Sequence, residues 1–397
     1  MASSKQVIDQ TEKYSAHNYK PKEVVFASGD GVIVKNPEGE EFFDMLSAYS
    51  ALNFGHKHPE LIQAAKDQLD NVTLSSRAFY NNLLGEFLEK LCKMTGKNKA
   101  LPMNTGAEAV ETALKTARRW GNFVKGVEDG KQEIIVCSDN FHGRTIAIIS
   151  MSTDPVARKG FGPFVPGFKV VEYGNLAELE AAINENTVAF LMEPIQGEAG
   201  VKCPPAGFMK KAYELCKSKN VLFIADEVQT GFARTGDMFA VQHEGFEPDV
   251  YIFGKALGGG VMPISAVVAN DDILGVFSPG SHGSTFGGNP LACAVALKAM
   301  EILERDKYPE MAKEKGEYFM SKLREIKNPK IVDVRGRGLL IGVEFDCDAA
   351  PYVKKLIAGG VLAKETHETT IRFAPPVVIT KEQIDKAVEI IKKAFAE

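Results

Sequence analysis

The chain has 397 residues, enough to bury a large core and to form two or three structural units. Its formal net charge of −5 is spread along the chain without a basic cluster, which argues against nucleic-acid binding. No apolar run approaches the roughly 20 residues that span a bilayer, and the cysteines are scattered without a CxxC pair, which indicates reduced thiols rather than a disulfide framework.

The first fifteen residues are polar and carry charges of both signs. They lack the apolar core of a signal peptide and the Arg-rich, acid-poor bias of a transit peptide. We therefore expect the protein in the cytoplasm.

A helix is predicted from residue 105 onward. Apolar side chains recur there at helical spacing, at Ala109, Ala113, Leu114 and Ala117. Gly121 is the predicted end of the helix, and Thr105-Gly106-Ala107 would be its start. Exposed backbone N–H groups and the positive end of the helix dipole favour a phosphate at such a start. Any capped helix looks similar, so this motif alone is weak evidence for a phosphate site.

The middle of the chain alternates short apolar runs with longer amphipathic stretches. The runs are continuous, as expected for strands covered on both faces: Glu133–Ser138, Val188–Met192, Val221–Ala225 and Val250–Phe253. The amphipathic stretches between them include Leu176–Ile183 and Gly207–Lys219. This alternation predicts an α/β domain with a mainly parallel sheet flanked by helices.

Two of these runs are followed by residues that can do chemistry. Asp226 and Glu227 come directly after one run, and Lys255 follows another just before the glycines 258–260. An acid at a strand end is usually a cap, and a lone lysine is usually a surface charge. Here ligands are expected at the carboxyl ends of the strands, so the acid and the lysine should share one edge. An apolar strand before Lys255 and glycines after it indicate a desolvated amine that can act as a nucleophile.

Together these elements call for a cofactor with a phosphate for the helix start, an aldehyde for the lysine and a basic nitrogen for the aspartate. Pyridoxal 5′-phosphate (PLP) has all three. An acid beside its pyridine nitrogen keeps that nitrogen protonated, and the ring then serves as an electron sink.

The C-terminal region follows a different pattern. Residues 330–345 contain two apolar runs joined by Arg335-Gly-Arg-Gly338, which predicts two strands meeting at a tight turn. Residues 380–395 are typical of a surface helix, with Thr380 and Gln383 forming a capping box. We therefore expect a large PLP-binding unit over 46–290 and a smaller α+β unit made of 1–45 and 291–397.

A series of motifs runs along the chain: YSAHNYKP (14–21), DMLSAYSALNFGHKHP (44–59), SRAFYNN (76–82), LPMNTGAEA (101–109), FHGRT (141–145), GFGPFVPG (160–167), EPIQGEAG (193–200), IADEVQTGFARTG (224–236), GKALGGG (254–260), HGSTFGGNP (282–290) and IRFAPP (371–376). With them the chain resembles the class-III aminotransferases of fold type I from about residue 14 to its end. The motif around Asp226 together with GKALGGG is highly specific to that class. AHNY, SRAFYNN and IRFAPP indicate its ornithine branch.

The resemblance implies the following roles around the cofactor. Lys255 would hold PLP as a Schiff base and carry a proton during transfer, and Asp226 would pair with the pyridinium nitrogen. Gln229 would bond the phenolic oxygen of the ring, and Phe141 would stack on its face. The backbone of Gly106 and Ala107 would hold the phosphate.

Two further residues would act across a subunit boundary. The resemblance implies that Ser284 and Thr285 reach the phosphate of the partner subunit, so the active site implies a homodimer. Without the resemblance, this Gly-rich segment would be an ordinary surface turn.

For the substrates, the resemblance implies two arginine anchors. Arg144 would bind the α-carboxylate of ornithine with bidentate geometry, with Tyr19 assisting at that end and Tyr49 shaping the pocket. The bland alternative for Arg144 is a surface salt bridge. Arg372 would bind the carboxylate beside the keto group of 2-oxoglutarate, and we expect Glu198 to pair with Arg372 while ornithine is bound.

The activity implied is the conversion of L-ornithine and 2-oxoglutarate to glutamate 5-semialdehyde and L-glutamate by a PLP ping-pong mechanism, in arginine and proline metabolism. Alternatives are an N-acetylornithine or 4-aminobutyrate aminotransferase, against which Tyr19 and Tyr49 argue because a free α-amine benefits from phenolic hydrogen bonds. A PLP aminomutase would use the same lysine and aspartate. A non-catalytic binding protein is disfavoured by Lys255, Asp226 and Arg144.

Three histidine-containing features point elsewhere. His142 departs from the aromatic residue of animal relatives and sits beside the predicted ring position. His56 and His58 could suggest a metal pair, but no further ligand cluster accompanies them, so we interpret them as structural and predict no metal. Ser281, His282 and Asp226 could be read as a hydrolase triad, but no nucleophile elbow surrounds the serine.

Overall fold

The computed structural model describes residues 2–396, so residues 1 and 397 of the predicted small unit lie outside it. Its centre is a seven-stranded sheet in the order β4-β10-β9-β8-β7-β5-β6. The strands are β4 (Lys99–Met103), β5 (Glu133–Cys137), β6 (Phe168–Val171), β7 (Thr187–Met192), β8 (Leu222–Asp226), β9 (Val250–Phe253) and β10 (Ser265–Ala269). Strands β5 to β9 pair in parallel, and β10 runs antiparallel to both neighbours. The predicted α/β class with a mainly parallel sheet is confirmed.

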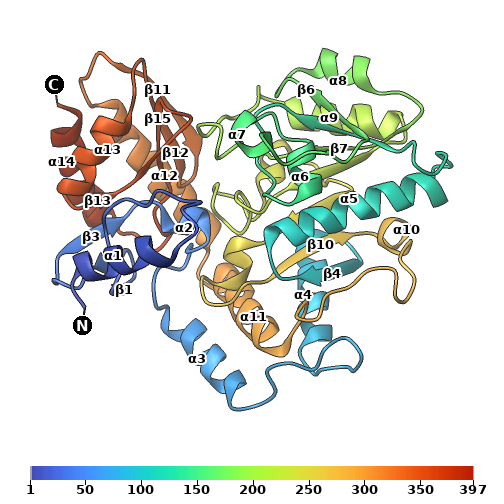
Figure 1. Ribbon diagram of the computed structural model, residues 1–397, viewed down its shortest axis with the longest axis horizontal. Coiled ribbons are helices and arrows are strands. Elements are labelled where there is room, and N and C mark those ends of the chain that lie inside the picture. The colour runs from blue at the N-terminus through green and yellow to red at the C-terminus, as the bar shows by residue number, and fades with distance from the viewer. Residues whose placement is uncertain (1, 397) are drawn as a thin grey trace.

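Helices cover both faces of this sheet (Figure 1). They are α4 (Leu84–Thr95), α5 (Gly106–Phe123), α6 (Ile146–Ser150), α7 (Pro155–Arg158), α8 (Leu176–Ala182), α9 (Phe208–Ser218), α10 (Asp271–Leu274) and α11 (Pro290–Arg305), with short 3-10 helices η1 (Ala240–Glu244) and η2 (Lys255–Gly258). Alternate residues of a strand enter different cores: Phe223 belongs to the core that contains α9, and Ile224 to the core that contains α5. Strands β7, β8 and β9 are buried along their whole length, which explains their unbroken apolar runs.

The predicted end of α5 at Gly121 is wrong, because the helix continues to Phe123. Gly121 is buried inside the helix, and a Cβ atom there would lie 2.2 Å from Cγ1 of Val188 in β7. The glycine therefore allows α5 to pack closely on the sheet rather than ending the helix.

The remaining elements form a second group, drawn in blue and red on the same side of the molecule (Figure 1). One sheet has the order β1-β2-β3-β13 and the other β11-β12-β15-β14. The strands are β1 (Ser28–Asp30), β2 (Ile33–Lys35), β3 (Glu41–Asp44), β11 (Ile331–Arg337), β12 (Leu340–Phe345), β13 (Val361–Leu362), β14 (Lys364–Thr366) and β15 (Thr370–Phe373). The helices are α1 (Ser4–Tyr14), α2 (Ser47–Ser50), α12 (Tyr308–Arg324), α13 (Ala350–Ala358) and α14 (Lys381–Phe395). The exception among the remaining elements is α3 (Pro59–Leu69), which lies apart from this group and packs against α11 (Figure 1). Strand β13 pairs in parallel with β3, so segments from opposite ends of the chain share one sheet.

Two C-terminal predictions can be compared with these elements. The predicted strand pair is present, but Arg335, Gly336 and Arg337 belong to β11, and the turn lies at residues 338–339. Gly338 has a φ of +51°, which favours glycine at that turn. The capping box of α14 is confirmed, since Thr380 Oγ1 accepts the backbone N–H of Gln383, whose side chain accepts the N–H of Thr380.

One buried cation joins the two groups of elements. Arg234 is fully buried, and its guanidinium donates to Asn53 Oδ1 at 3.1 Å, Ser47 Oγ at 3.2 Å, Leu339 O at 2.9 Å and Pro375 O at 2.6 Å. These acceptors come from three separate stretches of the chain, so a single side chain holds them together. None of the helices in residues 2–396 has the length and apolar character needed to cross a membrane.

Candidate active site

A cavity of about 190 Å³ lies at the carboxyl edge of the parallel strands. The segments that follow β5, β7, β8 and β9 meet there, together with the start of α5. The lining residues are Gly106, Ala107, Phe141, His142, Gly143, Glu193, Ile195, Asp226, Val228, Gln229 and Lys255. The predicted meeting of Lys255 and Asp226 at one edge is therefore present in the structure.

Lys255 follows β9 after one glycine and is the first residue of η2. Its φ is +43°, a conformation that costs a non-glycine residue on the order of 1 kcal/mol. Gly254 makes room beside it, because a Cβ atom there would lie 3.3 Å from Val228 Cγ1 and 3.5 Å from Gly106 Cα. Burial lowers the pKa of the Lys255 amine, even though the charge of Glu198 opposes this shift. The amine is thus prepared to react in its neutral form.

The first turn of α5 offers two free donors to the cavity. Thr105 and Glu108 form a capping box, in which Thr105 Oγ1 accepts the N–H of Glu108 and Glu108 Oε2 accepts that of Thr105. A helix start has four unpaired N–H groups. The box satisfies two, and those of Gly106 and Ala107 have no hydrogen-bond partner among residues 2–396. These two groups form an anion site at the positive end of the helix dipole.

Asp226 ends β8 and is almost fully buried. Its Oδ2 lies 2.6 Å from Nδ1 of His142, and its Oδ1 accepts the N–H of Val228 at 3.1 Å. Glu193, which follows β7, accepts the N–H of Phe141 through Oε2 at 3.0 Å. Burial raises the pKa of Glu193 to about 8. Asp226 therefore lines the cavity in direct contact with a histidine.

A charged pair stands next to the lysine. Arg372 Nη1 lies 2.7 Å from Glu198 Oε1 and 3.2 Å from Gln229 Oε1. The expected pairing of Glu198 with Arg372 is thus present. Arg372 is buried, and its Nε and Nη2 atoms have no hydrogen-bond partner within residues 2–396. The guanidinium of Arg372 also lies 5.0 Å from the ring centre of Tyr49, which brings Tyr49 to this side of the site.

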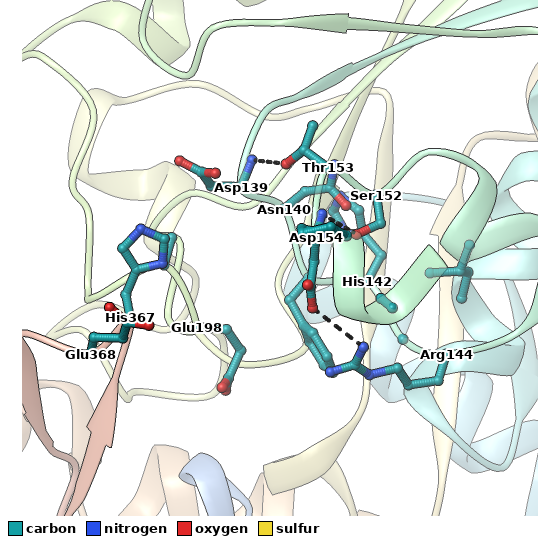
Figure 2. A pocket seen from close by; sticks show the side chains of 16 residues that line it. Asp139, Asn140, His142, Arg144, Ser152, Thr153, Asp154, Glu198, His367 and Glu368 are labelled. Carbon is teal, nitrogen blue, oxygen red and sulfur yellow. Dashed lines mark hydrogen bonds and ion pairs between the residues drawn. The ribbon is translucent and has the colours of Figure 1, made fainter. Parts of the chain in front are cut away.

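A second cavity of about 430 Å³ shares Phe141, His142 and Gly143 with the first. Figure 2 shows Arg144 on one side of it, with Glu198 and the hairpin residues His367 and Glu368 facing from the other side. Arg144 keeps 59% of its side chain exposed and lies 3.6 Å from Asp154. Its guanidinium also lies 5.3 Å from the ring centre of Phe141. The predicted surface salt bridge exists, but it is loose and sits at the mouth of the reactive cavity.

Five predicted residues line neither cavity: Tyr49 and Arg372, which contact each other, and Tyr19, Ser284 and Thr285. Tyr19 is 76% exposed and lines a separate apolar cavity with Tyr49. Ser284 accepts a hydrogen bond from Asn104 Nδ2 at 2.9 Å, and Thr285 is exposed. The described chain by itself therefore does not bring Tyr19, Ser284 or Thr285 to Lys255.

Sequence reasoning missed two buried groups of the site. Glu193 is the first residue of the motif EPIQGEAG, but the sequence predicted no role for it. Nor did the sequence predict the bond between His142 and Asp226. The signal that singled out Asp226 also applies to Glu193, because Glu193 directly follows the apolar strand β7. No comparable sequence signal pairs His142 with an acid 84 residues away.

The alternative histidine readings can be placed as well. His56 lies 2.8 Å from Asp44, and His58 precedes α3 as its N-cap residue, which agrees with the structural interpretation. His282 lies beside Thr112 and Lys115 at 2.8 Å from each, away from Asp226. The histidine and aspartate of the hydrolase reading are therefore not in contact.

Comparisons with known proteins agree with this geometry. The family model for aminotransferase class-III matches residues 14–395. An ornithine aminotransferase of Brevibacillus brevis is 60% identical over 395 residues, which cover 100% of this chain and 99% of that protein. The structure of the ornithine aminotransferase from Toxoplasma gondii, described with partial occupancy of PLP at its active site, has a TM-score of 0.98 and 44% identity, covering 99% of this chain and 94% of that one. An acetylornithine aminotransferase from Elizabethkingia anophelis has a TM-score of 0.91 and 45% identity, covering 100% and 99%.

The residues of the cavity fit PLP, the cofactor on which class-III aminotransferases depend. The free N–H pair of Gly106 and Ala107 fits its phosphate, the Lys255 amine fits its aldehyde, and the Asp226 carboxylate fits its pyridine nitrogen. Small residues at 106, 107 and 143 leave space there, since a Cβ atom on Gly143 would lie 3.0 Å from that of Ala107. By sequence, fold and site, the chain belongs to the class-III aminotransferase family.

Proposed function

We propose that the chain is an ornithine δ-aminotransferase, which converts L-ornithine and 2-oxoglutarate to glutamate 5-semialdehyde and L-glutamate. Relatives named ornithine aminotransferase that are 56–60% identical over nearly the whole chain support this proposal. The observation that carries it is a buried arginine, Arg372, held by Glu198 near Lys255, with Arg144 only loosely paired in the adjoining cavity. Such a site can bind substrate carboxylates at two different distances from the Lys255 amine.

PLP, when bound, supplies an aldehyde that takes up the amino group and a ring that accepts electrons from the carbon beside it. The residues of the chain would stabilise charges on the cofactor and transfer a proton to and from the substrate. Lys255 Nζ is the group that would accept and return the proton, because burial keeps its pKa low enough for the neutral amine to form. Asp226 would hold a positive charge on the pyridine nitrogen, and Gln229 would donate to the phenolic oxygen.

Ornithine would bind with its δ-amine toward Lys255 and its α-carboxylate at Arg144. Arg144 keeps donors available for a bidentate contact because its pairing with Asp154 is 3.6 Å long and mostly exposed. While Glu198 neutralises Arg372, an α-carboxylate gains little by binding beside Lys255. The reacting end of ornithine is therefore its δ-amine rather than its α-amine.

2-Oxoglutarate requires a different state of the same pair. Its carboxylate beside the keto group would bind Arg372 in place of Glu198, and its distal carboxylate would bind Arg144. The unpartnered Nε and Nη2 atoms of Arg372 give that arginine donors for an incoming carboxylate, because an unmet buried donor is costly. The Glu198 side chain would swing away, which is compatible with its 25% exposure.

We also propose a homodimer that shares its active sites. Ser284 and Thr285 would then act on the phosphate bound by the partner subunit. Exposed aromatic side chains near this loop support a buried interface there, including Phe79, Tyr80 and Phe286, which are 74%, 101% and 51% exposed in the single chain. The cytoplasmic location stays a prediction.

N-acetylornithine aminotransferase is the second candidate, favoured by the similarity to the enzyme of that name from Elizabethkingia anophelis. The predicted argument from Tyr19 does not separate the two, because Tyr19 is exposed outside the cavity that contains Lys255. Tyr49 stays close to the site through its contact with Arg372. A direct comparison of substrates is therefore needed.

The test follows the visible absorption of the PLP-loaded protein. L-Ornithine alone should bleach the band of the lysine-bound cofactor, and 2-oxoglutarate should restore it. N-acetylornithine and 4-aminobutyrate should bleach it at least about tenfold more slowly at equal concentration. If one of those amines bleaches the band and ornithine does not, the substrate proposal is wrong. Turnover of a semialdehyde without any keto acid would instead indicate an aminomutase.

A further inference from the structure

One buried histidine of the site has no part in the chemistry described so far. His142 is 4% exposed and follows Phe141 in the loop that lines both cavities. Its Nδ1 lies 2.6 Å from Asp226 Oδ2. Its Nε2 is buried and has no partner among the residues that the structure describes. The ring is therefore fixed by one contact, and that contact is with the acid that faces the pyridine nitrogen.

The charged and titratable groups around His142 come from several elements. Asp226 ends β8 and Glu193 follows β7, while Lys255 follows β9. Behind Lys255 lie Glu198 and Arg372, which neutralise each other. Because burial raises the pKa of Glu193 to about 8, Glu193 is largely uncharged at neutral pH. Asp226 is thus the carboxyl group in direct contact with His142.

The protonation of His142 follows from this arrangement. Burial disfavours the imidazolium, but the hydrogen bond with Asp226 and its charge outweigh burial, and the pKa of His142 is raised above its ordinary value. Below that pKa the pair consists of an imidazolium and a carboxylate, which is stronger than a pair with neutral imidazole. Within residues 2–396 the other oxygen of Asp226 accepts a hydrogen bond only from the N–H of Val228, at 3.1 Å, so His142 also limits the rotation of the carboxylate.

We propose that His142 is a positioning residue that orients the carboxylate of Asp226 toward the pyridine nitrogen of PLP. An imidazolium holds a carboxylate more strongly than a neutral donor does. A carboxylate that can rotate away balances a positive pyridinium less well, so the chain would lose affinity for PLP without His142. The inference rests on the proposed PLP site but not on the identity of the amino donor.

The test uses His142→Asn, because the Asn amide nitrogen can replace Nδ1 as a neutral donor to Asp226. PLP is titrated into the wild-type and variant apoproteins at about pH 6 and about pH 9. At each pH the Kd of the variant for PLP is divided by the Kd of the wild type. PLP itself titrates identically in both experiments, so the ratio isolates the protein. The ratio should be about tenfold or more at pH 6, where His142 is charged, and clearly smaller at pH 9, where less of the imidazole is charged.

A matched control is His243→Asn. His243 Nδ1 also lies 2.6 Å from an acid, Asp237, but neither residue lines the cavity with Lys255. This variant should show a ratio near one at both pH values. If the Kd ratio for His142→Asn is raised equally at both pH values, His142 has a merely structural role. If that ratio is near one at both pH values, His142 has no role in PLP binding. Either result overturns the proposal.

A second measurement needs no variant. Nitrogen-15 NMR of the imidazole rings in wild-type apoprotein should show His142 still protonated at about pH 7. At that pH more than half of an ordinary histidine is deprotonated. A neutral ring at that pH would overturn the proposal even if His142→Asn failed to fold. Failure of wild-type apoprotein to bind PLP would overturn both this proposal and the cofactor assignment, whereas binding without ornithine turnover would overturn only the substrate proposal.

Discussion

The buried Arg372 forms an ion pair with the partly exposed Glu198 and keeps two donors without a hydrogen-bond partner among residues 2–396. Removing charges from water is costly, and the cost is offset only while each charge has a partner. The proposed mechanism uses this: the anion that completes the arginine would be Glu198 in one half-reaction and a substrate carboxylate in the other. Selectivity for the distal amine then follows from competition between two carboxylates for one cation.

Glu198→Ala should weaken this selectivity. With Arg372 permanently free, α-amino substrates gain a carboxylate partner beside Lys255, so kcat/KM for L-glutamate relative to L-ornithine should rise by about tenfold or more. Steady-state kinetics with both amino donors measures the ratio. Glu344→Ala serves as a control, because Glu344 also pairs with an arginine, Arg335, but outside the cavity. An unchanged ratio in Glu198→Ala would mean that Glu198 is not a gate.

Helix α5 connects the residue scale to the element scale, because one helix both presents the anion site and packs on the sheet. Its first turn leaves two N–H groups free, and Gly121 near its end sets its distance from β7. Close packing of the C-terminal end of α5 on β7 also fixes the orientation of its first turn, where the N–H groups are free. We therefore expect substitutions at Gly121 to affect stability first.

Gly121→Ala should lower the free energy of unfolding by about 1–3 kcal/mol, since the added methyl group would overlap Val188. Gly85→Ala in α4 is the matched control. Gly85 is exposed, and nothing lies within 4 Å of the position of an added Cβ atom, so alanine there should be neutral or stabilise by about 0.5–1 kcal/mol. Urea unfolding of the apoproteins measures both. Equal stabilities of the two variants would contradict the close packing of α5 on β7.

Strand β8 ends beside a second buried acid, Glu227, whose Oε1 accepts the N–H of Val241 at 2.9 Å. Burial raises the pKa of Glu227 to about 7 from 4.5. The folded protein thus keeps a proton that the unfolded chain releases above about pH 4.5. The resulting stabilisation is complete below that pH and is lost as the pH rises through about 7.

Glu227→Gln removes this titration while keeping an oxygen for Val241. As the pH rises from about 5 to about 8, the unfolding free energy of the variant should increase relative to that of the wild type by on the order of 1–3 kcal/mol. Urea unfolding at both pH values gives the difference. A gain that is constant with pH would show that Glu227 is already ionised in the folded protein.

Local patterns predicted most of the elements, whereas contacts between distant residues could not be predicted. The parallel strands were located to within a residue or two because both of their faces are buried, and the cap of α14 because Thr380 and Gln383 are neighbours. Gly121 was misread since a glycine that ends a helix and one that admits a close neighbour look alike in sequence. Lys255 and Asp226 were predicted from their strands and Arg372 from the resemblance, but the bond of His142 to Asp226 depends on how the segment after β5 packs against the end of β8.

At the scale of the whole molecule, Arg234 holds stretches around residues 47–53, 339 and 375 through hydrogen bonds to neutral acceptors. A buried cation satisfied only by oxygen dipoles is sensitive to the loss of any part of the network. The stretch containing residues 47–53 also includes Tyr49, and the one containing Pro375 follows Arg372. Arg234 therefore supports the substrate side of the site from a distance.

Arg234→Ala should cost on the order of 3–5 kcal/mol, because it leaves several buried oxygens without donors and opens a cavity. Arg305→Ala is the control, since Arg305 pairs with Glu60 on the surface and should cost at most about 1 kcal/mol. The midpoints of urea unfolding compare the two. If both variants unfold at the same urea concentration, Arg234 does not hold the molecule together.

The pairing of β3 with β13 has a consequence for how the protein is made. The strand at residues 41–44 has no partner at 361–362 until the ribosome has added more than three hundred further residues. At roughly 5–20 residues per second, Phe43 and Asp44 wait between a quarter of a minute and a minute for that partner. Strands β1 to β3 can pair with one another early, but the outer edge of β3 stays open on the nascent chain, and chaperones can hold it until translation is nearly complete.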